Sequence, residues 1–255
     1  MCSDASQPRE ADVNRLPSIS AFFPAYNEEQ NVASMVERLS AVLPRVADDY
    51  EIIVVNDGSA DRTGAIADQL AAADPHVRAV HHAVNRGYGG ALQSGFAASR
   101  KEYVFFTDGD GQFDVAEIER LLPYVPEYDV VAGYRLERAE GGLRKLNAAA
   151  WNWLVRRLFH IPVRDVDCAF KLFKRRVFDT VHAEAEGAMI STEVLARAVR
   201  AGFRVTEVGV HHYERAHGKP TGANPLVIVR AFYELFKLYR RITGERGAAK
   251  RPTHG

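Results

Sequence analysis

Short apolar runs alternate with amphipathic segments through the first half of the chain. The runs are rich in Val, Ile and Phe and are bounded by Gly, Pro, Asn and Asp, as is typical of buried strands in a parallel sheet. They predict strands over residues 19–23, 51–55, 76–81, 103–107 and 128–132. The segments between them predict helices over residues 28–43, 63–73, 89–100 and 115–122. This alternation indicates an α/β domain with a doubly wound, mostly parallel sheet.

The first helix carries the clearest boundary signals. We expect Pro24 to end the first strand and Asn27 to cap the helix, with Glu28 and Glu29 at its positive end.

The second half of the chain is less regular. Its pattern predicts helices over residues 143–159, 192–201 and 225–242 and strands over 170–173 and 203–208. The last helix is amphipathic, with four charged residues on one face and a broad apolar face opposite. We therefore divide the chain into a disordered tail (1–16), a folded domain (17–222), an amphipathic C-terminal helix (223–243) and a second disordered tail (244–255).

Composition fits one globular domain, with 47% hydrophobic and 26% charged residues among 255. Net charge is zero but uneven: residues 1–130 carry 10 Lys and Arg against 21 Asp and Glu, and residues 131–255 carry 23 against 12. The basic half suits an anionic partner such as a diphosphate or a lipid phosphate, or is simply solvated surface. Cys2 and Cys168 do not suggest a structural disulfide, so a reducing compartment fits. Residues 1–15 lack the apolar stretch of a secretion signal, and no run approaches the ~20 apolar residues of a spanning helix, so we expect a soluble or peripheral protein.

Two aspartates directly follow the strand predicted at residues 103–107. Asp108 and Asp110 lie at an edge where open α/β sheets bind ligands. A Mg²⁺-type cation held by one or two carboxylates completes its shell with phosphate oxygens and water. An ordinary acidic turn and a calcium loop are the alternatives, but the calcium loop needs Gly where Phe113 stands and a helix before it. The pair favours a metal–phosphate site in an enzyme that handles a nucleotide diphosphate.

Two more motifs lie where neighbouring strands end. Asp57, followed by Gly58 and Ser59, suits either a helix start or an acceptor for a base N–H or a ribose hydroxyl. The glycine-rich run at residues 85–92 opens a helix, so its N–H groups suit an anion or simply a turn. Its spacing and position do not fit a Rossmann dinucleotide site.

The second half adds polar residues with more than one possible use. Asp165 and Glu193 could act as a general base toward an acceptor hydroxyl, or form a polar rim. Arg215 and Lys219, in a Gly-containing loop, are candidates to stabilise a diphosphate leaving group. Cys168 is expected to be a packed thiol, because no neighbour in the sequence would activate it.

In order and spacing these motifs resemble the family-2, inverting, metal-dependent glycosyltransferases with a GT-A fold (the nucleotide-diphospho-sugar transferase type). Within that family the chain is most similar to the dolichol-phosphate mannosyltransferases and their bacterial polyprenyl-phosphate relatives. The resemblance spans roughly residues 18–220. The matching pieces are residues 24–28, 56–59, 61, 85–87, 108–112, 133–135, 170–173, 193 and 213–219.

The resemblance implies a role for each piece, within a catalytic domain at residues 17–222. The residues that would line the donor pocket are Pro24, Tyr26, Glu28, Asp57, Arg86, Asp108, Arg135 and Lys171. Asp110, with Asp108 and Gln112, would hold Mg²⁺ or Mn²⁺, which offsets charge on the leaving diphosphate. Asp110 and Arg215 would then be catalytic, with Glu193 or Asp165 as the base for a hydroxyl acceptor. A phosphate acceptor is already anionic and needs no base.

For the whole protein, the resemblance implies transfer of a sugar from a GDP- or UDP-linked donor to a polyprenyl phosphate, with inversion. Such a hexosyltransferase would be cytoplasmic, or peripheral at the inner face of the membrane, and would have no nucleic-acid partner. Two alternatives remain: a soluble glycosyltransferase acting on a hydroxyl acceptor, and a non-catalytic module that binds sugar nucleotides. A nucleotide-sugar pyrophosphorylase shares this sheet type, but its phosphate loop is missing near the first strand.

The chain departs from the family pattern in three places. Ser191 stands where the family often has Asp, which weakens a base-catalysed reaction, and Ala169 stands where Gly is common. Many relatives that act on lipid phosphates also carry spanning helices. Here the helices predicted at 143–159 and 225–242 either lie on an anionic membrane surface or pack internally.

Overall fold

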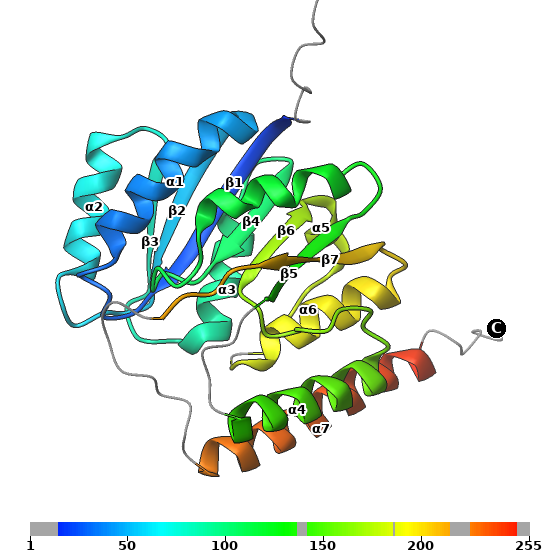
Figure 1. The fold of residues 1–255 in the computed structure, drawn as a ribbon. Helices are drawn as coiled ribbons and strands as arrows, with labels where there is room; N and C mark the ends of the chain where they lie inside the picture. The colour runs from blue at the N-terminus through cyan, green and yellow to red at the C-terminus, as the bar shows by residue number, and fades with distance from the viewer. Residues whose placement is uncertain (1–14, 137–141, 186, 215–224, 249–255) are drawn as a thin grey trace, which may run out of the picture.

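The computed structural model describes residues 15–136, 142–185, 187–214 and 225–248, which form a single sheet with helices around it (Figure 1). The strand order is β3-β2-β1-β4-β6-β5-β7. The strands are β1 (Leu16–Ala25), β2 (Ala47–Asn56), β3 (Val77–His81), β4 (Tyr103–Thr107), β5 (Val130–Arg135), β6 (Phe170–Lys174) and β7 (Val205–Val210). β6 is antiparallel to both of its neighbours, β4 and β5, and the other neighbouring strands are parallel. The predicted doubly wound, mostly parallel sheet is confirmed.

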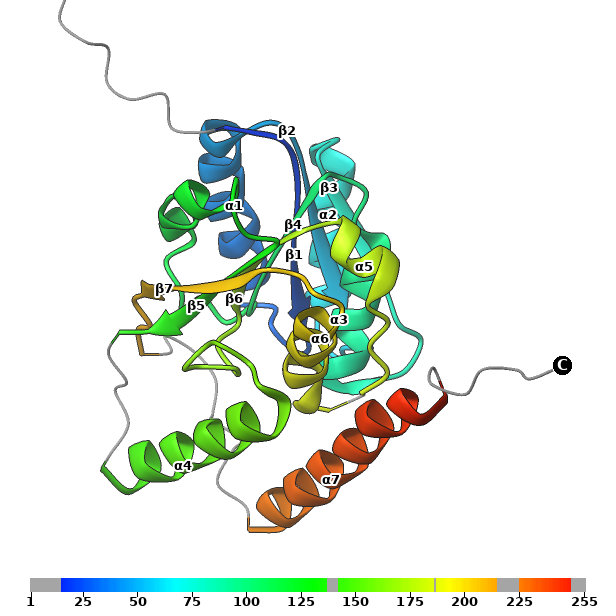
Figure 2. The same cartoon turned by 90° about the vertical axis from the view of Figure 1, so that its right-hand side faces the viewer.

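Helices cover both faces of this sheet. They are α1 (Val32–Val46), α2 (Thr63–Ala73), α3 (Gly87–Ala98), α4 (Gly142–Phe159), α5 (Arg176–Thr180), α6 (Met189–Arg200) and α7 (Pro225–Ala248), with two 3-10 turns, η1 (Val115–Arg120) and η2 (Leu122–Tyr124). α1 and α2 pack on one face, and α3 packs on the other, where α6 lies next to it. α7 packs on α6, and α4 lies beside α7. Figures 1 and 2 both show the α4–α7 pair beyond the end of the sheet toward which β1 runs.

Stacked aromatic rings fill the core between the sheet and α3. Phe22 of β1 and Phe106 of β4 stack with ring centres 5.7 Å apart, and Phe106 stacks on Phe173 of β6 at 6.2 Å. Phe96 of α3 meets the Phe22 ring edge-on at 5.0 Å. Gly95 permits this close approach, because a Cβ there would lie 2.2 Å from the Phe22 ring. This packing fixes α3, whose first turn contributes to the candidate site.

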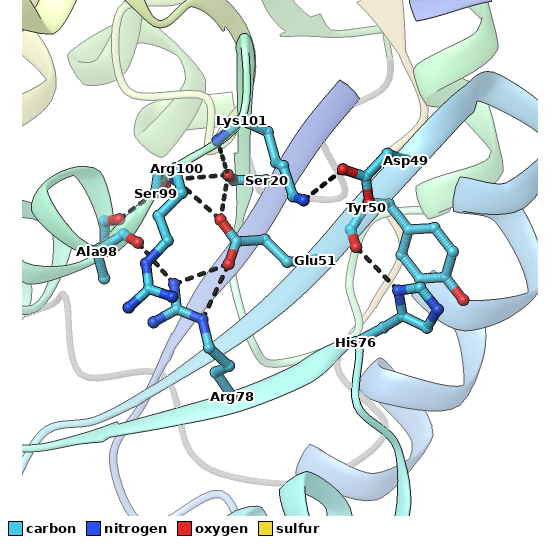
Figure 3. Close-up of polar contacts among 11 residues, drawn as sticks. Ser20, Asp49, Tyr50, Glu51, His76, Arg78, Ala98, Ser99, Arg100 and Lys101 are labelled. Carbon is cyan, nitrogen blue, oxygen red and sulfur yellow. Dashed lines mark hydrogen bonds and ion pairs between the residues drawn. The ribbon is translucent and has the colours of Figure 1, made fainter. Parts of the chain in front are cut away.

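A buried polar cluster joins the first strands to the chain that enters β4 (Figure 3). Glu51 of β2 is 6% exposed and accepts hydrogen bonds from Ser20 Oγ at 2.7 Å, from the Arg100 amide at 2.9 Å and from Arg78 Nε at 2.9 Å. Burial raises the pKa of Glu51, but these donors outweigh it and hold the pKa below its usual value. Ser20 Oγ also accepts from the amides of Arg100 and Lys101. The cluster therefore fastens the α3–β4 connection to the centre of the sheet.

The start of the first helix differs from the prediction. Asn27 does not cap it: its φ is +55°, and its Oδ1 accepts the amide of Ala60 at 2.9 Å. α1 begins at Val32 instead. Pro24 does not end β1, which continues to Ala25. The side chain of Asn27 is thus used by a partner 33 residues away, which a local cap signal does not reveal.

Other boundaries also moved. The helix predicted at residues 115–122 is the pair of turns η1 and η2, and Asp114 Oδ1 accepts the Ala116 amide at the start of η1. The short helix α5 was not predicted, and α7 extends to Ala248, so residues 244–248 are helical rather than part of a tail. The tails at 1–14 and 249–255 lie outside the described residues. Within the described helices, none has both the length and the apolar character needed to span a membrane.

Candidate active site

The loop after β1 and the turn after β2 are joined by hydrogen bonds. The Asn27 amide donates to Ser59 Oγ at 3.0 Å, while its side chain holds the Ala60 amide. The Glu28 amide donates to Thr63 Oγ1 at 2.9 Å. Because β1 and β2 are adjacent parallel strands, these contacts make one continuous wall at their carboxyl ends.

Asp57, the first residue after β2, is buried in this wall. Its Oδ1 accepts from His82 Nδ1 at 2.5 Å and from the Arg86 amide at 2.8 Å. His82 Nε2 in turn lies 2.8 Å from Ser94 Oγ. Among the described residues, none donates to Asp57 Oδ2. One carboxylate oxygen is thus engaged by the protein, and the other remains able to accept a ligand hydrogen bond.

Asp108 and Asp110 follow β4 directly. The Tyr88 hydroxyl, from the first turn of α3, donates to Asp108 Oδ1 at 3.0 Å, and the Gln112 amide donates to Asp110 Oδ1 at 3.1 Å. Burial, aided by the charge of Asp108, raises the pKa of Tyr88 well above its usual value. The hydroxyl therefore keeps its proton and donates to the carboxylate.

These strand ends enclose an open cleft of about 560 Å³. Its lining residues are Pro24, Ala25, Tyr26, Asn27, Glu28, Asp57, Asn85, Gly87, Tyr88, Ala91, Asp108, Gly109 and Asp110. Gly109 is pressed against the β1 end, where a Cβ would lie 2.6 Å from the Pro24 carbonyl oxygen. Six of the predicted site residues thus come together from β1, β2 and β4, as parallel strands ending at one edge would place them.

The donor set in the cleft fits a hard divalent cation. Within the described residues, no group of three or more His, Cys, Asp or Glu side chains is arranged to hold a metal. Asp108 and Asp110 supply two carboxylates. That number suits Mg²⁺ or Mn²⁺ bound together with phosphate oxygens and water, rather than in an all-protein cage.

Arg135, Asp165 and Lys171 do not line the cleft; Asp165 and Lys171 are buried, and Arg135 is partly buried. Arg135 Nε and Nη2 donate to Asp165 Oδ2 and Oδ1 at 2.8 and 2.9 Å. Lys171 is 1% exposed and donates to the carbonyls of Val166 and Cys168. Burial lowers the pKa of Lys171. In this structure both cations support the turn at residues 165–168, so their predicted phosphate contacts would require this turn to rearrange.

Glu193, the other predicted base, has no exposed surface. Its Oε2 accepts the amides of Glu184 and Ala185 at 2.9 and 2.7 Å. Its Oε1 pairs with Arg197 at 2.9 Å and lies 3.5 Å from Arg241 of α7. Both carboxylate oxygens are occupied. Glu193 ties α7, and also the loop that precedes α6, to α6 itself. This geometry does not favour a general base.

Two other predicted residues, Arg86 and Gln112, use their polar groups on the protein itself. Arg86 uses its amide on Asp57, and its guanidinium lies 3.4 Å from Ser94 Oγ rather than in the cleft lining. The Gln112 side-chain amide donates to the Tyr213 carbonyl at 2.8 Å, which ties the acidic loop to the chain after β7. Arg215 lies outside the described residues, and its role remains a prediction.

Cys168 is the packed thiol that was expected. It is free and fully buried, and burial raises its pKa to about 12. Such a thiol is protonated at neutral pH and is a poor nucleophile.

Sequence reasoning missed Tyr88, His82 and Ser94. Tyr88 belongs to the glycine-rich run, and a lone aromatic residue in the first turn of a helix at the sheet edge was the available signal. His82 directly follows β3, so it lies at the same edge as Asp57. Ser94 lies seven residues after Gly87, two helical turns along α3.

Comparison with known proteins supports one family. The chain matches the family model for glycosyl transferase family 2 over residues 20–181. Glycosyltransferase AglD of Haloferax volcanii is 39% identical over 204 residues, covering 75% of this chain and 32% of that protein. An undecaprenyl-phosphate 4-deoxy-4-formamido-L-arabinose transferase of Pseudomonas fluorescens is 33% identical, covering 79% of this chain and 59% of that protein. The chain therefore spans only part of the length of these curated relatives.

Solved structures share the fold. Glucosyl-3-phosphoglycerate synthase from Mycobacterium tuberculosis, in complex with Mn²⁺ and UDP-glucose, has a TM-score of 0.63 at 21% identity, over 91% of this chain and 77% of that one. Mannosyl-3-phosphoglycerate synthase from Rubrobacter xylanophilus has a TM-score of 0.64 at 17% identity, over 93% and 78%. With its cleft at the carboxyl ends of β1, β2 and β4, and with the family match over most of the sheet, the chain belongs to glycosyl transferase family 2.

Proposed function

We propose that this chain transfers the sugar of a GDP- or UDP-linked donor to a polyprenyl phosphate, with inversion at the anomeric carbon and with Mg²⁺ or Mn²⁺. The observation that carries the proposal is the convergence of Asp57, Asp108 and Asp110 on one cleft. A hydrogen-bond acceptor and a pair of carboxylates in the same cleft match a nucleoside joined to a metal-bound diphosphate.

The nucleoside would lie against the wall formed by the ends of β1 and β2. Asp57 Oδ2 would accept a base N–H, which both uracil and guanine present. Tyr26 is half exposed at the cleft and offers a ring on which a base can stack. Pro24 and Glu28 would complete this end of the pocket.

Asp110 and Asp108 would hold the cation beside the diphosphate. When bound, it offsets the negative charge that develops on the leaving nucleotide diphosphate. Tyr88 orients Asp108, and the Gln112 amide orients Asp110, so both carboxylates are positioned before a ligand arrives.

The class of acceptor is inferred from whether the carboxylates of the two predicted bases are occupied by protein partners. Asp165 is held by Arg135, and Glu193 is buried with both oxygens occupied. A phosphate oxygen needs no base, since it is already anionic. It would attack the anomeric carbon opposite the leaving group, and a new C–O bond would form as the bond to the nucleotide diphosphate breaks. The geometry therefore supports a phosphate acceptor over a hydroxyl acceptor.

A lipid source for that phosphate is supported by the surface of α4 and α7. Trp153, Phe232, Tyr233 and Phe236 are at least half exposed there. Basic residues accompany them: Arg156, Arg157, Lys237 and Arg240. Exposed aromatic and basic side chains suit an anionic membrane surface. The name of the arabinose transferase relative also specifies undecaprenyl phosphate. The enzyme would then work at the inner face of the membrane.

A second candidate is transfer to a hydroxyl of a small phosphorylated acceptor. It is favoured by one observation: a glucosyl-3-phosphoglycerate synthase with the same fold was solved with phosphoglyceric acid bound. In that case a carboxylate other than Asp165 or Glu193 in their present positions would have to accept the hydroxyl proton.

The test is release of free nucleoside diphosphate from a panel of GDP- and UDP-sugars with Mn²⁺ or Mg²⁺. It is run with and without a short polyprenyl phosphate, and beside Asp110→Asn. The matched control is Asp48→Asn, which changes an exposed carboxylate far along the chain. We expect release from one donor, raised strongly by the lipid phosphate and reduced at least about 100-fold by Asp110→Asn alone.

Each other outcome is informative. If release of nucleoside diphosphate is unaffected by the lipid phosphate but rises with phosphoglycerate, the hydroxyl acceptor is supported. If no donor is consumed and none binds with metal, the chain is a non-catalytic module and the proposal is wrong.

A further inference from the structure

A chain of three side chains supports the back of the cleft. Ser94 Oγ lies 2.8 Å from His82 Nε2, and His82 Nδ1 lies 2.5 Å from Asp57 Oδ1. The three residues come from α3, from the end of β3 and from the end of β2. The His82 and Asp57 side chains are 6% and 4% exposed, so water competes little for these hydrogen bonds.

The direction of the hydrogen bonds follows from the acceptor at one end. An ionised carboxylate only accepts, so His82 Nδ1 carries the proton that is donated to Asp57. This tautomer leaves Nε2 as an acceptor, and the Ser94 hydroxyl donates to it. Arg86 contributes twice, since its amide donates to the same Asp57 oxygen and its Nη1 lies 3.4 Å from Ser94 Oγ.

The order of Ser, His and Asp matches that of a hydrolase triad, but the setting does not. Ser94 lies within α3, where the helix hydrogen bonds use the neighbouring backbone amides. No backbone N–H pair there can form an oxyanion hole. Neither Ser94 nor His82 lines the cleft, whereas Asp57 does. The three residues therefore act on a ligand only through Asp57.

We propose that Ser94 and His82 form a positioning relay, which holds the Asp57 carboxylate with Oδ1 inward and presents Oδ2 to the N–H of the donor base. This inference rests on the proposed nucleotide-sugar donor. With Oδ1 doubly engaged, rotation of the carboxylate would break two hydrogen bonds, so the acceptor is fixed before the base arrives. His82 and Ser94 are thus positioning residues for donor recognition, not catalytic residues.

The relay also predicts which bases are accepted. A fixed carboxylate oxygen rewards a ring N–H, as in uracil and guanine. It repels the ring nitrogen lone pairs that adenine and neutral cytosine present at the corresponding edge. Loosening the carboxylate should weaken this discrimination as well as affinity.

The test combines a protein change with a ligand change. Binding of UDP and GDP with Mn²⁺ is measured by titration calorimetry for the wild type, His82→Ala, His82→Asn and Ser94→Ala. The better-binding nucleotide is then replaced by the analogue methylated at the ring N–H. The control is His81→Ala, because the neighbouring His81 contacts Asp68 and Asn56 rather than Asp57. Thermal unfolding checks that each variant is folded.

For the wild type we expect methylation of the base to weaken binding about 10- to 100-fold, as for loss of a hydrogen bond to a charged group. His82→Ala should weaken binding of the unmodified nucleotide by about tenfold or more. In this variant, methylation of the base should weaken binding only slightly further. His82→Asn should recover much of the affinity, since its amide can donate in place of Nδ1. Ser94→Ala should have a smaller effect of the same kind, and His81→Ala none. In donor kinetics, KM should rise for His82→Ala with kcat nearly unchanged.

Two results would overturn the relay. One is unchanged nucleotide affinity in folded His82→Ala. The other is a full methylation penalty in that variant, which would mean that His82 and the base N–H act independently. If the wild type itself binds neither UDP nor GDP, the proposed donor is wrong, and this failure is distinct from failure of the relay.

Discussion

Tyr88 illustrates how a single hydroxyl can matter in this cleft. It donates to Asp108 Oδ1 at 3.0 Å, and its raised pKa keeps it protonated. We expect Tyr88→Phe to keep the fold, because the ring and its packing remain. The carboxylate would lose its fixed orientation, and Mn²⁺-dependent nucleotide binding should weaken about tenfold. Titration of Mn²⁺ at fixed nucleotide measures this effect.

The matched control for Tyr88→Phe is Tyr103→Phe, which removes a hydroxyl at the opposite end of β4. The two variants should have similar thermal stability and differ in metal dependence. Equal Mn²⁺ affinity in both would mean that the Tyr88 hydroxyl does not orient Asp108 for a metal.

Some of the candidate site residues could be predicted from the sequence and others could not. Asp57, Asp108 and Asp110 were predictable, because residues that follow parallel strands meet at one edge whatever the details of packing. The state of Asp165 was not, since its partner Arg135 lies 30 residues away along the chain. The state of Glu193 was not either, since two of its donors are backbone amides, of Glu184 and Ala185, which carry no signal in the sequence. A sequence shows that a carboxylate is present, but it does not show whether another side chain has already neutralised it.

At the scale of elements, the turn after β2 packs closely against the loop after β3. Gly58 has φ +69°, and a Cβ there would lie 2.6 Å from the Asn85 backbone nitrogen. Gly58→Ala must therefore strain the backbone and also push the two loops apart. We expect it to lower the free energy of unfolding by about 2–4 kcal/mol and to weaken nucleotide binding.

Gly202→Ala separates the two effects of Gly58→Ala. Gly202 has φ +87°, but a Cβ added there would meet nothing within 4 Å. It should show only the backbone penalty of about 1–2 kcal/mol, with normal nucleotide binding. Chemical denaturation and calorimetry of both variants measure the difference. If the two variants lose equal free energy of unfolding, the loop that contains Asn85 moves away from the added Cβ at no cost.

The Glu51 cluster gives a pH-dependent prediction for the same elements. The folded pKa of Glu51 is lowered, so its contribution is complete above its unfolded pKa of about 4.3 and is lost as pH falls from there through the folded pKa. At pH 7, Glu51→Gln should lower the free energy of unfolding by about 1.5–3 kcal/mol, as for hydrogen bonds to a charged group.

That difference should shrink below about pH 4.3, since a protonated Glu51 resembles Gln. Urea unfolding at several pH values from 3 to 7 measures it. Glu37→Gln on α1, outside the cluster, is the control. A constant gap between wild type and Glu51→Gln across this range would contradict the assignment.

Elements were easier to predict than their registers. The alternation of apolar and amphipathic segments gave the sheet and most helices, because burial on both faces leaves a strong pattern. The place of β6 was not readable, since it inserts antiparallel between β4 and β5 and opposes Lys171 to Phe106. That register turns Lys171 into the core, where it supports carbonyls instead of a phosphate.

At the scale of the whole molecule, the α4–α7 pair lies beyond the end of the sheet at which β1, β2 and β4 finish (Figures 1 and 2), and most of the residues that line the cleft lie at or just after the ends of these strands. The helix pair belongs to the half of the chain with net charge +11. Leu235, Leu238 and Ile242 of α7 are buried, whereas Phe236 of α7 and Trp153 of α4 are exposed. A membrane bound by this surface would hold a lipid phosphate near the open cleft.

The double substitution Trp153→Ala with Phe236→Ala tests this arrangement. Both side chains are more than half exposed, so the fold should be retained. We expect the partition coefficient onto phosphatidylglycerol vesicles, measured by sedimentation, to fall about tenfold or more, because two interfacial aromatic anchors are lost. Added salt should weaken wild-type binding further, as basic side chains contribute.

The control is Tyr124→Ala, which removes an exposed aromatic residue on η2, outside the helix pair. It should sediment like the wild type. The same double variant should lose the stimulation of donor turnover by polyprenyl phosphate in vesicles while keeping turnover of a short, water-soluble polyprenyl phosphate. Retention of wild-type sedimentation would show that the membrane is not bound by this surface. Loss of activity toward the soluble acceptor as well would mean that α4 and α7 shape the acceptor site itself.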